Sequence, residues 1–551
     1  MIRTAFRTRL PALLPLLLLG AAHAQLSAPA TVARTAGVYP AAAAPGETAW
    51  IFGLSGVPAE GRLNIGGQTT EYRLDRPSGW LAFQVPPAAA GGPQPLTLRG
   101  APQTLRLNVL TLPPGTDALV YVRPDAAKTV QAEYTRRLQA LTETCAKSCP
   151  AEVQSVLKRL SAQPAPALAP LTAPVKGQGV TPGLAARAAV TPAVRAPLIN
   201  LNTLKATNLT GLLNPVARPP AAPADSICSA LAGTVPTAGL PLGQVLTLLE
   251  LIFAGDLQTD PTWVGYPTQS DAPYQNEKPI TVLQKVLQVR AASGKGTTIH
   301  VLDTATPTGD SFVMDGDINY YNQLYGNRPY HGRAVGEIAR AVAPGAQLNY
   351  RQVCDKDGTC STLKTVQALC AVAADARRGG RHVVNLSLGG PNPTRGLELA
   401  LREVTALGVP VAASYGNRDD CAGLVAGDRC NHYPADWTRS FEFGPAVNLA
   451  SRSLRPTMLF SVAGWDIAGG QLATYNRGVG NPGVLTEAPS VQAPGEFWLG
   501  GYPYFGTSFA APVVSGLLAS WMSCQPGVPL LPLITTPGQA PIAASVVNAC
   551  P

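Results

Sequence analysis

Side chains able to carry out hydrolysis together lie in three separate segments of the sequence, at Asp303, His331 and Ser508. Ser508 stands in segment 506–512, which reads GTSFAAP and predicts the beginning of a helix. A neutral hydroxyl is a weak nucleophile, so hydrolysis near neutral pH needs a base within hydrogen-bond reach and a carboxylate that orients the base. The three residues therefore predict acyl transfer. As an alternative, Ser508 is a simple N-cap, a role that does not exclude catalysis.

His331 is the histidine best placed to act as this base. It precedes a glycine and an apolar helical run, which predicts a free imidazole at the start of a helix. His300 and His382 fall within apolar strands and are predicted to be structural, and His432 neighbours Cys430 in a loop. We therefore assign the proton transfer to His331.

Asp303 is the predicted partner of this histidine because it comes directly after the buried strand 298–302. The alternative is an ordinary aspartate that caps the next turn. Asp310, Asp315 and Asp317 are rival carboxylates, but they occupy a polar loop and are expected to face solvent or to contribute to a calcium site.

Further segments accompany these residues in a fixed order. The Asp segment reads GKGTTIHVLDT at 294–304, the His segment HGRAV at 331–335, and the turn after it APGAQL at 343–348. Segment 383–389 reads VVNLSLG and segment 412–417 reads AASYGN. Together with the serine segment they resemble the subtilisin-like serine proteases, or subtilases, over less than half of the chain.

The resemblance implies roles for two further sets of residues. Asn417 would donate its side-chain amide to the oxyanion, beside the backbone NH of Ser508. An extended substrate would pair with the main chain of the substrate-binding strand. The ring of Tyr415 would narrow the pocket for the substrate side chain. The predicted substrate-binding residues are Ser387, Leu388, Gly389, Gly390, Tyr415 and Gly416.

Four positions depart from the family pattern, and all leave the three predicted catalytic residues in place. Ala305 replaces a usual glycine, and Ala334 replaces the second histidine of the His segment. Glu337 and Tyr415 stand where small residues are usual. The departures bear on the rate and the pocket shape more than on the type of reaction.

From about residue 280 onward, apolar runs alternate with helical segments. This rhythm predicts an α/β fold with a doubly wound, mainly parallel sheet covered on both faces, whose site lies at the carboxyl ends of the strands. Expected strands are 298–302, 347–352, 382–386, 409–413 and 458–462, and expected helices are 335–342, 363–377 and 394–407.

The rest of the chain predicts several further parts. They are a signal peptide at 1–24, a small β-sandwich-like module resembling TIG domains at 25–112, a partly helical pro-region at 113–162, a Pro/Ala-rich linker at 163–225, a lead-in at 226–289, the subtilisin-like catalytic domain at 290–524 and a tail at 525–551. In subtilases a pro-region assists folding and blocks the cleft, although an unrelated helical hairpin fits 113–162 about equally well.

Ten cysteines in an exported chain favour disulfides over metal sites, because no pair has the Cys-x-x-Cys spacing. Proximity and elimination leave several pairings open. The pairs we expect are Cys145 with Cys149, Cys228 with Cys370, Cys354 with Cys360, Cys421 with Cys430, and Cys524 with Cys550.

The charge and hydrophobic content of the chain limit the kinds of molecule it is expected to bind. A formal charge of +9 without dense basic runs argues against nucleic acid, and 46% hydrophobic residues support a sizeable core. We expect polypeptide substrates, no integral membrane segment after signal removal, no required cofactor, calcium only in a structural role, and a secreted product in the periplasm, at the cell surface or in the medium. The alternative is an inactive, protease-like binding protein that contacts a cell surface through its β module.

Overall fold

The structure is a computed structural model that describes residues 36–171 and 226–524 with internal gaps. The gaps are 55, 77, 99–104, 114, 147–148, 254, 268–277, 280–288, 305–310, 314–330, 356–357, 439–446, 450–451, 455–457, 467–469 and 500–501. Several predictions lie outside the described residues: the signal peptide, most of the linker, the tail, the Cys524–Cys550 pair, Ala305 and the rival aspartates.

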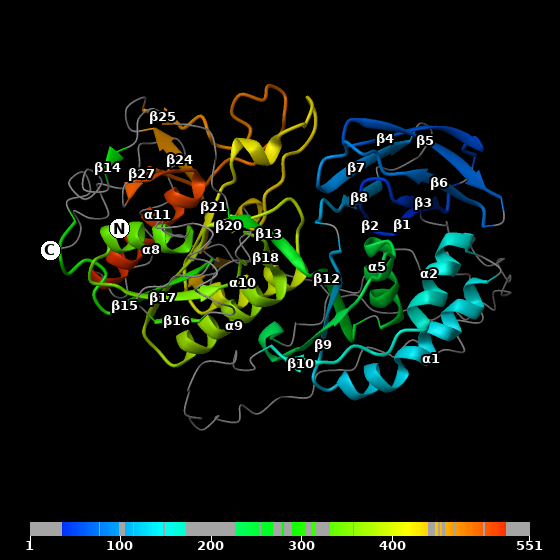
Figure 1. Cartoon of the computed structure of the whole chain (residues 1–551), viewed down its shortest axis with the longest axis horizontal. Coiled ribbons are helices and arrows are strands. Elements are labelled where there is room, and N and C mark those ends of the chain that lie inside the picture. Colours follow the sequence, from blue (N-terminus) through cyan, green and yellow to red (C-terminus); the bar gives the residue numbers. More distant parts are fainter. Residues whose placement is uncertain are drawn as a thin grey trace, which may run out of the picture. The chain divides into compact units, whose positions relative to one another are not determined.

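The carboxyl-terminal part contains an eight-stranded, mainly parallel sheet in the order β16-β17-β15-β19-β21-β24-β25, with β26 beside β24 (Figure 1). All neighbours are parallel except β25, which is antiparallel to β24. The bounds are β15 Thr297–Asp303, β16 Ser311–Val313, β17 Gln347–Gln352, β19 Arg381–Leu386, β21 Val411–Ser414, β24 Leu459–Asp466, β25 Gln471–Leu472 and β26 Val491–Ala493.

Helices cover both faces of this sheet. One apolar cluster joins α8 (His331–Val342) and α11 (Thr507–Cys524) to one face, and a second joins α9 (Thr362–Arg377) and α10 (Arg395–Ala406) to the other. Alternation along each strand explains the division, because successive side chains point to opposite faces. The doubly wound arrangement expected from the sequence is therefore observed.

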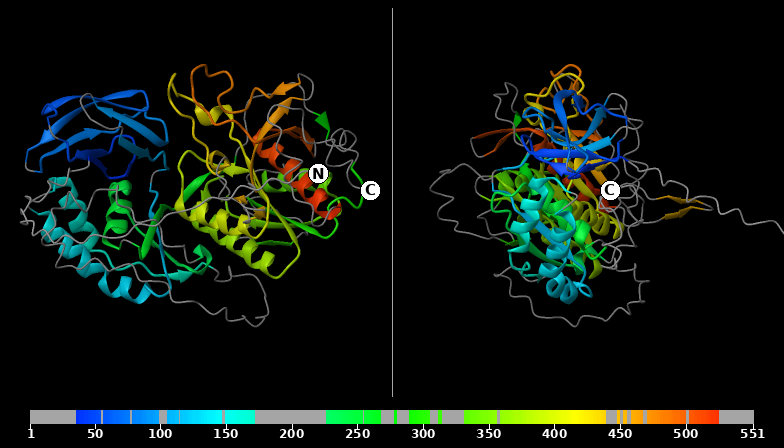
Figure 2. Two further views of the ribbon diagram at one scale, coloured as in Figure 1. Left: turned by 180° about the vertical axis from the view of Figure 1, so that it is seen from behind. Right: turned by 90° about the vertical axis from the view of Figure 1, so that its right-hand side faces the viewer.

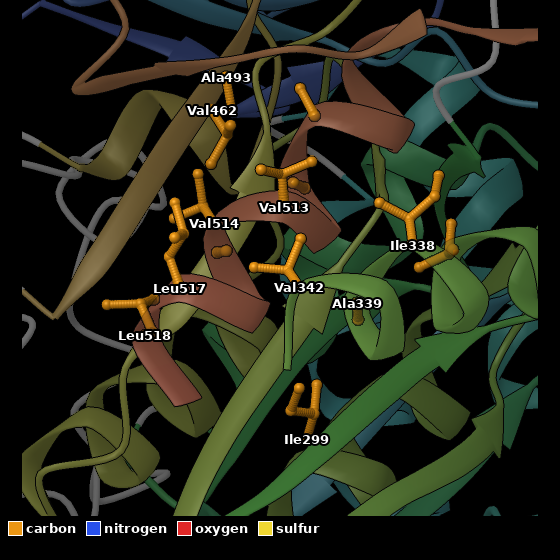
Figure 3. Packing of buried hydrophobic residues seen from close by; sticks show 14 of the residues in the cluster. Ile299, Ile338, Ala339, Val342, Val462, Ala493, Val513, Val514, Leu517 and Leu518 are labelled. Atoms are coloured by element: carbon orange, nitrogen blue, oxygen red, sulfur yellow. The ribbon is translucent and has the colours of Figure 1, made fainter. Parts of the chain in front are cut away.

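Close packing of α8 against α11 brings the two predicted catalytic helix starts together. A Cβ added to Gly516 would lie 2.6 Å from Cβ of Val342, so glycine permits this approach of the helices. Figure 3 shows apolar side chains of both helices, among them Val342 and Val513, together with Ile299 of the sheet. The helices are thus held by burial rather than by surface charge.

The amino-terminal module is all β between residues 37 and 109. Its strands form one continuous hydrogen-bonded path, β1-β3-β6-β5-β4-β7-β8-β2, so the two separate sheets of the expected sandwich are not distinguished by their pairing. The bounds are β1 Gly37–Tyr39, β2 Ala42–Ala43, β3 Thr48–Phe52, β4 Glu60–Ile65, β5 Gln68–Asp75, β6 Trp80–Gln84, β7 Gly92–Leu98 and β8 Leu105–Val109.

A four-stranded antiparallel sheet follows, in the order β10-β11-β9-β12. Its strands come from the predicted pro-region at 113–162 (β9), the predicted linker at 163–225 (β10) and the predicted lead-in at 226–289 (β11 and β12). The bounds are β9 Ala118–Val122, β10 Ala169–Pro170, β11 Leu231–Val235, β12 Leu257–Pro261, α1 Ala127–Cys145, α2 Ala151–Ser161 and α5 Leu242–Ile252. We refer to residues 118–261 as the middle domain.

One apolar core is shared by the middle domain and the β module, whose helices and strands are drawn from two further sides in Figure 2. Trp50 and Trp80 of the β module belong to the same buried cluster as Tyr134 of α1 and Leu249 of α5. The amide of Ala41 also donates a hydrogen bond to Thr247 Oγ1. Residues on both sides of the expected boundary at 112 therefore belong to one buried cluster.

Four of the expected disulfides are present: Cys145–Cys149, Cys228–Cys370, Cys354–Cys360 and Cys421–Cys430. Of these, Cys228–Cys370 joins the middle domain to α9, and its two side chains are buried in one apolar cluster.

The remaining elements are short. They are β13 Trp263–Pro267, β14 Lys278–Pro279, β18 Cys360–Ser361, β20 Leu388–Gly389, β22 Val447–Leu449, β23 Arg452–Leu454, β27 Glu496–Leu499, β28 Tyr502–Phe505, and the 3-10 turns η2 Ile227–Ser229, η3 Arg418–Cys421 and η4 Ala435–Trp437. Within the described part of the chain, every helix is too short or too polar to cross a bilayer.

Candidate active site

Asp303 and His331 are in direct contact at the carboxyl end of β15. Oδ1 of Asp303 lies 2.7 Å from Nδ1 of His331; the Asp303 side chain is fully buried and that of His331 is 8% exposed. The amide of Thr304 also donates to Oδ1 at 2.7 Å, and Thr304 Oγ1 accepts from the amide of Gly332 at 2.9 Å. The end of β15 lies beside the start of α8, so this contact fixes the orientation of the imidazole ring. Nε2 is then the ring nitrogen that does not contact Asp303.

Ser508 is the second residue of α11 and is fully buried. Its Oγ donates a hydrogen bond to the carbonyl of Ser387 at 3.1 Å, while Ser387 Oγ donates to the carbonyl of Ser508 at 2.7 Å. The sequence-predicted nucleophile and the first residue of the predicted substrate strand are therefore adjacent. A helix amino terminus also places positive potential beside Ser508.

The imidazole of His331 lies beside the start of α11. Its ring centroid is 5.2 Å from that of Phe509, the residue after Ser508. Nε2 of His331 is buried and has no hydrogen-bond partner among the described residues. The structure thus brings His331 to the helix of the predicted nucleophile, with the serine hydroxyl bonded to Ser387 instead of to the imidazole.

Asn417 follows β21 and lies next to the residue that precedes Ser508. Its Oδ1 accepts hydrogen bonds from the amide of Thr507 at 3.0 Å and from Thr507 Oγ1 at 3.1 Å. Asp420 accepts from the amide of Asn417 at 2.7 Å, and Gly416 adopts a positive φ of 103°. Two bonds to one oxygen fix the orientation of the carboxamide, so its position relative to Ser508 is well defined.

The predicted substrate strand is already paired with another part of the chain. In β13, Tyr266 lies opposite Gly389 and Pro267 opposite Leu388, in antiparallel register. On its other side β13 pairs with β18, so it forms the middle strand of three. Gly265 is required here, because an added Cβ would lie 2.0 Å from the carbonyl oxygen of Gly389.

Tyr415 and Gly416 border this region on the side of β21. The Tyr415 ring is buried, its hydroxyl donates to the carbonyl of Glu487, and the guanidinium of Arg477 lies 4.1 Å from its centroid. Gly390 exchanges backbone hydrogen bonds with Tyr433. The predicted substrate-binding residues therefore gather around Ser508 and Asn417.

His432 belongs to the site although its sequence context gave no sign of it. Its ring is 1% exposed, and Nδ1 lies 3.3 Å from Oδ2 of Asp420. A Cβ added to Gly389 would meet Nε2 at 2.2 Å, and one added to Gly416 would meet Cγ at 2.9 Å. Burial and the charge of Arg477 lower the pKa of His432 well below its usual value, which favours the neutral ring.

The described side chains include no group of three or more His, Cys, Asp or Glu residues arranged to hold a metal ion. The acyl-transfer chemistry expected from the sequence uses only side chains and backbone amides.

Comparisons with known proteins agree with this arrangement. Residues 294–537 match the subtilase family. The chain is 29% identical to M-protease from Shouchella clausii over 259 residues, which is 43% of this chain and 58% of that protein. It is 31% identical to Subtilisin Savinase from Lederbergia lenta over 169 residues, or 28% of this chain and 57% of that protein. Residues 294–537 thus form a domain of the subtilase family.

The chain thus spans less than two thirds of the length of these relatives, 58% and 57%. The match covers the parallel sheet with α8 to α11 and leaves the β module and the middle domain outside it.

Proposed function

We propose that the chain is an exported serine endopeptidase made as an inhibited precursor. His331 takes the proton of Ser508 as the hydroxyl attacks a peptide carbonyl, Asp303 holds His331 in the required tautomer, and water later releases the acyl-enzyme. Asn417 and the backbone NH of Ser508 stabilise the oxyanion. Substrates are unfolded polypeptides that pair with segment 387–390 as an added strand.

The observation that carries the proposal is the 2.7 Å contact between Asp303 and His331, on the face where α11 presents Ser508. An aspartate bonded to Nδ1 leaves Nε2 as the atom that can accept a proton. We expect rotation about the Cα–Cβ bond of Ser508 to exchange its bond with Ser387 for one with His331. Catalytic hydrogen bonds often form fully only when substrate is bound.

The middle domain and β13 serve, in this proposal, as the inhibitory pro-region. Pairing of β13 with Leu388 and Gly389 occupies the strand that an extended substrate would use. Docking is reinforced by Asp260, whose carboxylate accepts hydrogen bonds from the amides of Arg395 and Gly396 at 2.6 Å each. Activity therefore requires cleavage after β13 and withdrawal of that strand.

A fluorophosphonate probe tests the reaction. Labelling of the secreted, processed chain and its loss in Ser508→Ala supports the proposal, because only an activated serine reacts. Ser515→Ala is a matched control in the same helix and is expected to be labelled like the wild type. A processed, folded chain without label would argue for the alternative function.

That alternative is a protease-like binding protein without activity. It is favoured by one observation, the hydrogen bond from Ser508 Oγ to Ser387 rather than to His331. In that case the β module would carry the function, and Ser508→Ala would leave every property of the protein unchanged.

A further inference from the structure

The register of β13 locates the residue that precedes the bond to be cut. Tyr266 and Pro267 lie opposite Gly389 and Leu388, so the paired chain runs toward Ser387 and therefore toward Ser508. Under the proposed function, an acyl group attacked by Ser508 must lie beside Asn417 as well. Its side chain must therefore project between the segment of Gly389 and the segment that precedes Asn417.

That space is occupied by the ring of His432. The distances to the Cβ positions of Gly389 and Gly416, 2.2 Å and 2.9 Å, place the ring directly between two residues that have no side chain. The absence of side chains at these two glycines leaves room for the imidazole, and we call the space between them the slot. His432 stands two residues after the Cys421–Cys430 disulfide, and its amide donates a hydrogen bond to Oδ2 of Asp436 at 2.8 Å.

The polar atom at the end of this ring has no partner. Nδ1 faces the carboxylate of Asp420, so in the neutral ring Nδ1 carries the proton and Nε2 is an acceptor. Nε2 is buried and makes no hydrogen bond with the described residues. A buried acceptor without a donor is unfavourable, so a ligand hydroxyl would complement it.

We propose that His432 is the specificity-determining residue of the proposed peptidase, restricting the side chain before the scissile bond to small groups and favouring those with a hydroxyl. This inference rests on the proposed function and names its substrate class: polypeptides cut after serine, threonine or alanine.

The test is a set of fluorogenic peptides that differ only in the residue before the cut. They are assayed with the secreted protein that has been cut after β13 and retains all its parts. We expect kcat/KM for Ser, Thr and Ala peptides to exceed that for Phe and Leu peptides by about 10²-fold, the discrimination a filled pocket provides. His432→Gly should raise the Phe-to-Ala ratio of kcat/KM by at least about tenfold, because a ring-sized space opens.

His382→Asn is the matched control, since it removes a histidine of β19 that bonds His300 at 3.0 Å outside the slot, and it should leave the ratio unchanged. If His432→Gly does not fold, the relative kcat/KM values of the wild type for these peptides test the inference without the variant. A wild type that prefers Phe or Leu overturns the inference and leaves the proposed function standing. A folded, processed chain that cuts no peptide and takes no fluorophosphonate overturns both.

Discussion

Cys228 and Cys370 are joined by a disulfide that ties the middle domain to helix α9 of the subtilase domain. Cys228 lies in η2, three residues before β11, whereas the strand that pairs with the predicted substrate-binding segment is β13, further along the chain. Cutting the chain after β13 therefore leaves the middle domain covalently attached. Withdrawal of β13 and departure of the middle domain become separate events.

We accordingly expect a two-chain product. Secreted protein cut after β13 should migrate as one species on a non-reducing gel and as two after reduction. In Cys228→Ser/Cys370→Ser the pieces should separate without reductant. Two separate pieces from the wild type on a non-reducing gel would contradict the tether.

Replacing Asp303 by Asn should lower kcat by about 10⁴-fold, because an amide no longer selects the imidazole tautomer with its proton on Nδ1. The side chains are nearly the same size, so the melting temperature should change little. Steady-state kinetics and circular dichroism measure the two effects. Asp419→Asn, an exposed position, is the control, and an equal loss in both variants would count against the role of Asp303.

Asn417→Ala should lower kcat by about 10²–10³-fold with little effect on KM, since the carboxamide is proposed to bind only the oxyanion. The variant also leaves the amide and hydroxyl of Thr507 without their acceptor, which costs about 1–3 kcal/mol. Kinetics together with urea unfolding separates the two consequences. Asn481→Ala, which loses a bond to Cys421 instead, should keep its kcat.

The sequence predicted the parallel sheet well because its strands are short apolar runs between helices with a regular period. Segment 347–352 coincides with β17, and Asp303 and His331 lie at a strand end and a helix start as expected. Side-chain periodicity is a local property, so it can be recognised in the sequence without knowledge of the tertiary contacts.

The middle domain and His432 could not be predicted in this way. The sheet of β9 to β12 pairs strands separated by a long Pro/Ala-rich segment, and β10 has only two residues, too few for a period. The ring of His432 lies against Gly389 and Gly416, which are 43 and 16 residues away in the sequence. Such contacts depend on distant backbone positions, which no sequence window contains.

Trp50 connects the stability of the β module to that of the middle domain. It is 2% exposed in the cluster that also contains α1 and α5, so Trp50→Ala should destabilise both by about 3–5 kcal/mol. Faster amide hydrogen exchange in α5, measured in the Ser508→Ala precursor, would reveal the effect. Leu74→Ala changes an exposed side chain and should stay within about 0.5 kcal/mol. Unchanged exchange in α5 would mean that the two units are independent.

Asp260 should make docking of the middle domain dependent on pH. Burial raises the pKa of Asp260 to about 7 from its ordinary value of 3.8, and the nearby charge of Glu250 adds to the increase. Between these values the docked state binds more protons than the released state, so docking weakens as pH rises toward 7, by at most about 1.4 kcal/mol per unit.

Calorimetry of the Ser508→Ala precursor between pH 4 and pH 8 measures this dependence. The transition of the middle domain should move to lower temperature as pH rises, and Asp260→Asn, which does not titrate, should flatten the slope. Asp256→Asn is the control and should keep the wild-type slope, because the Asp256 carboxylate pairs with Arg123, with Oδ1 3.4 Å from Nη2. A slope that persists in Asp260→Asn would assign the pH dependence to other groups and leave Asp260 with only its hydrogen bonds to the start of α10.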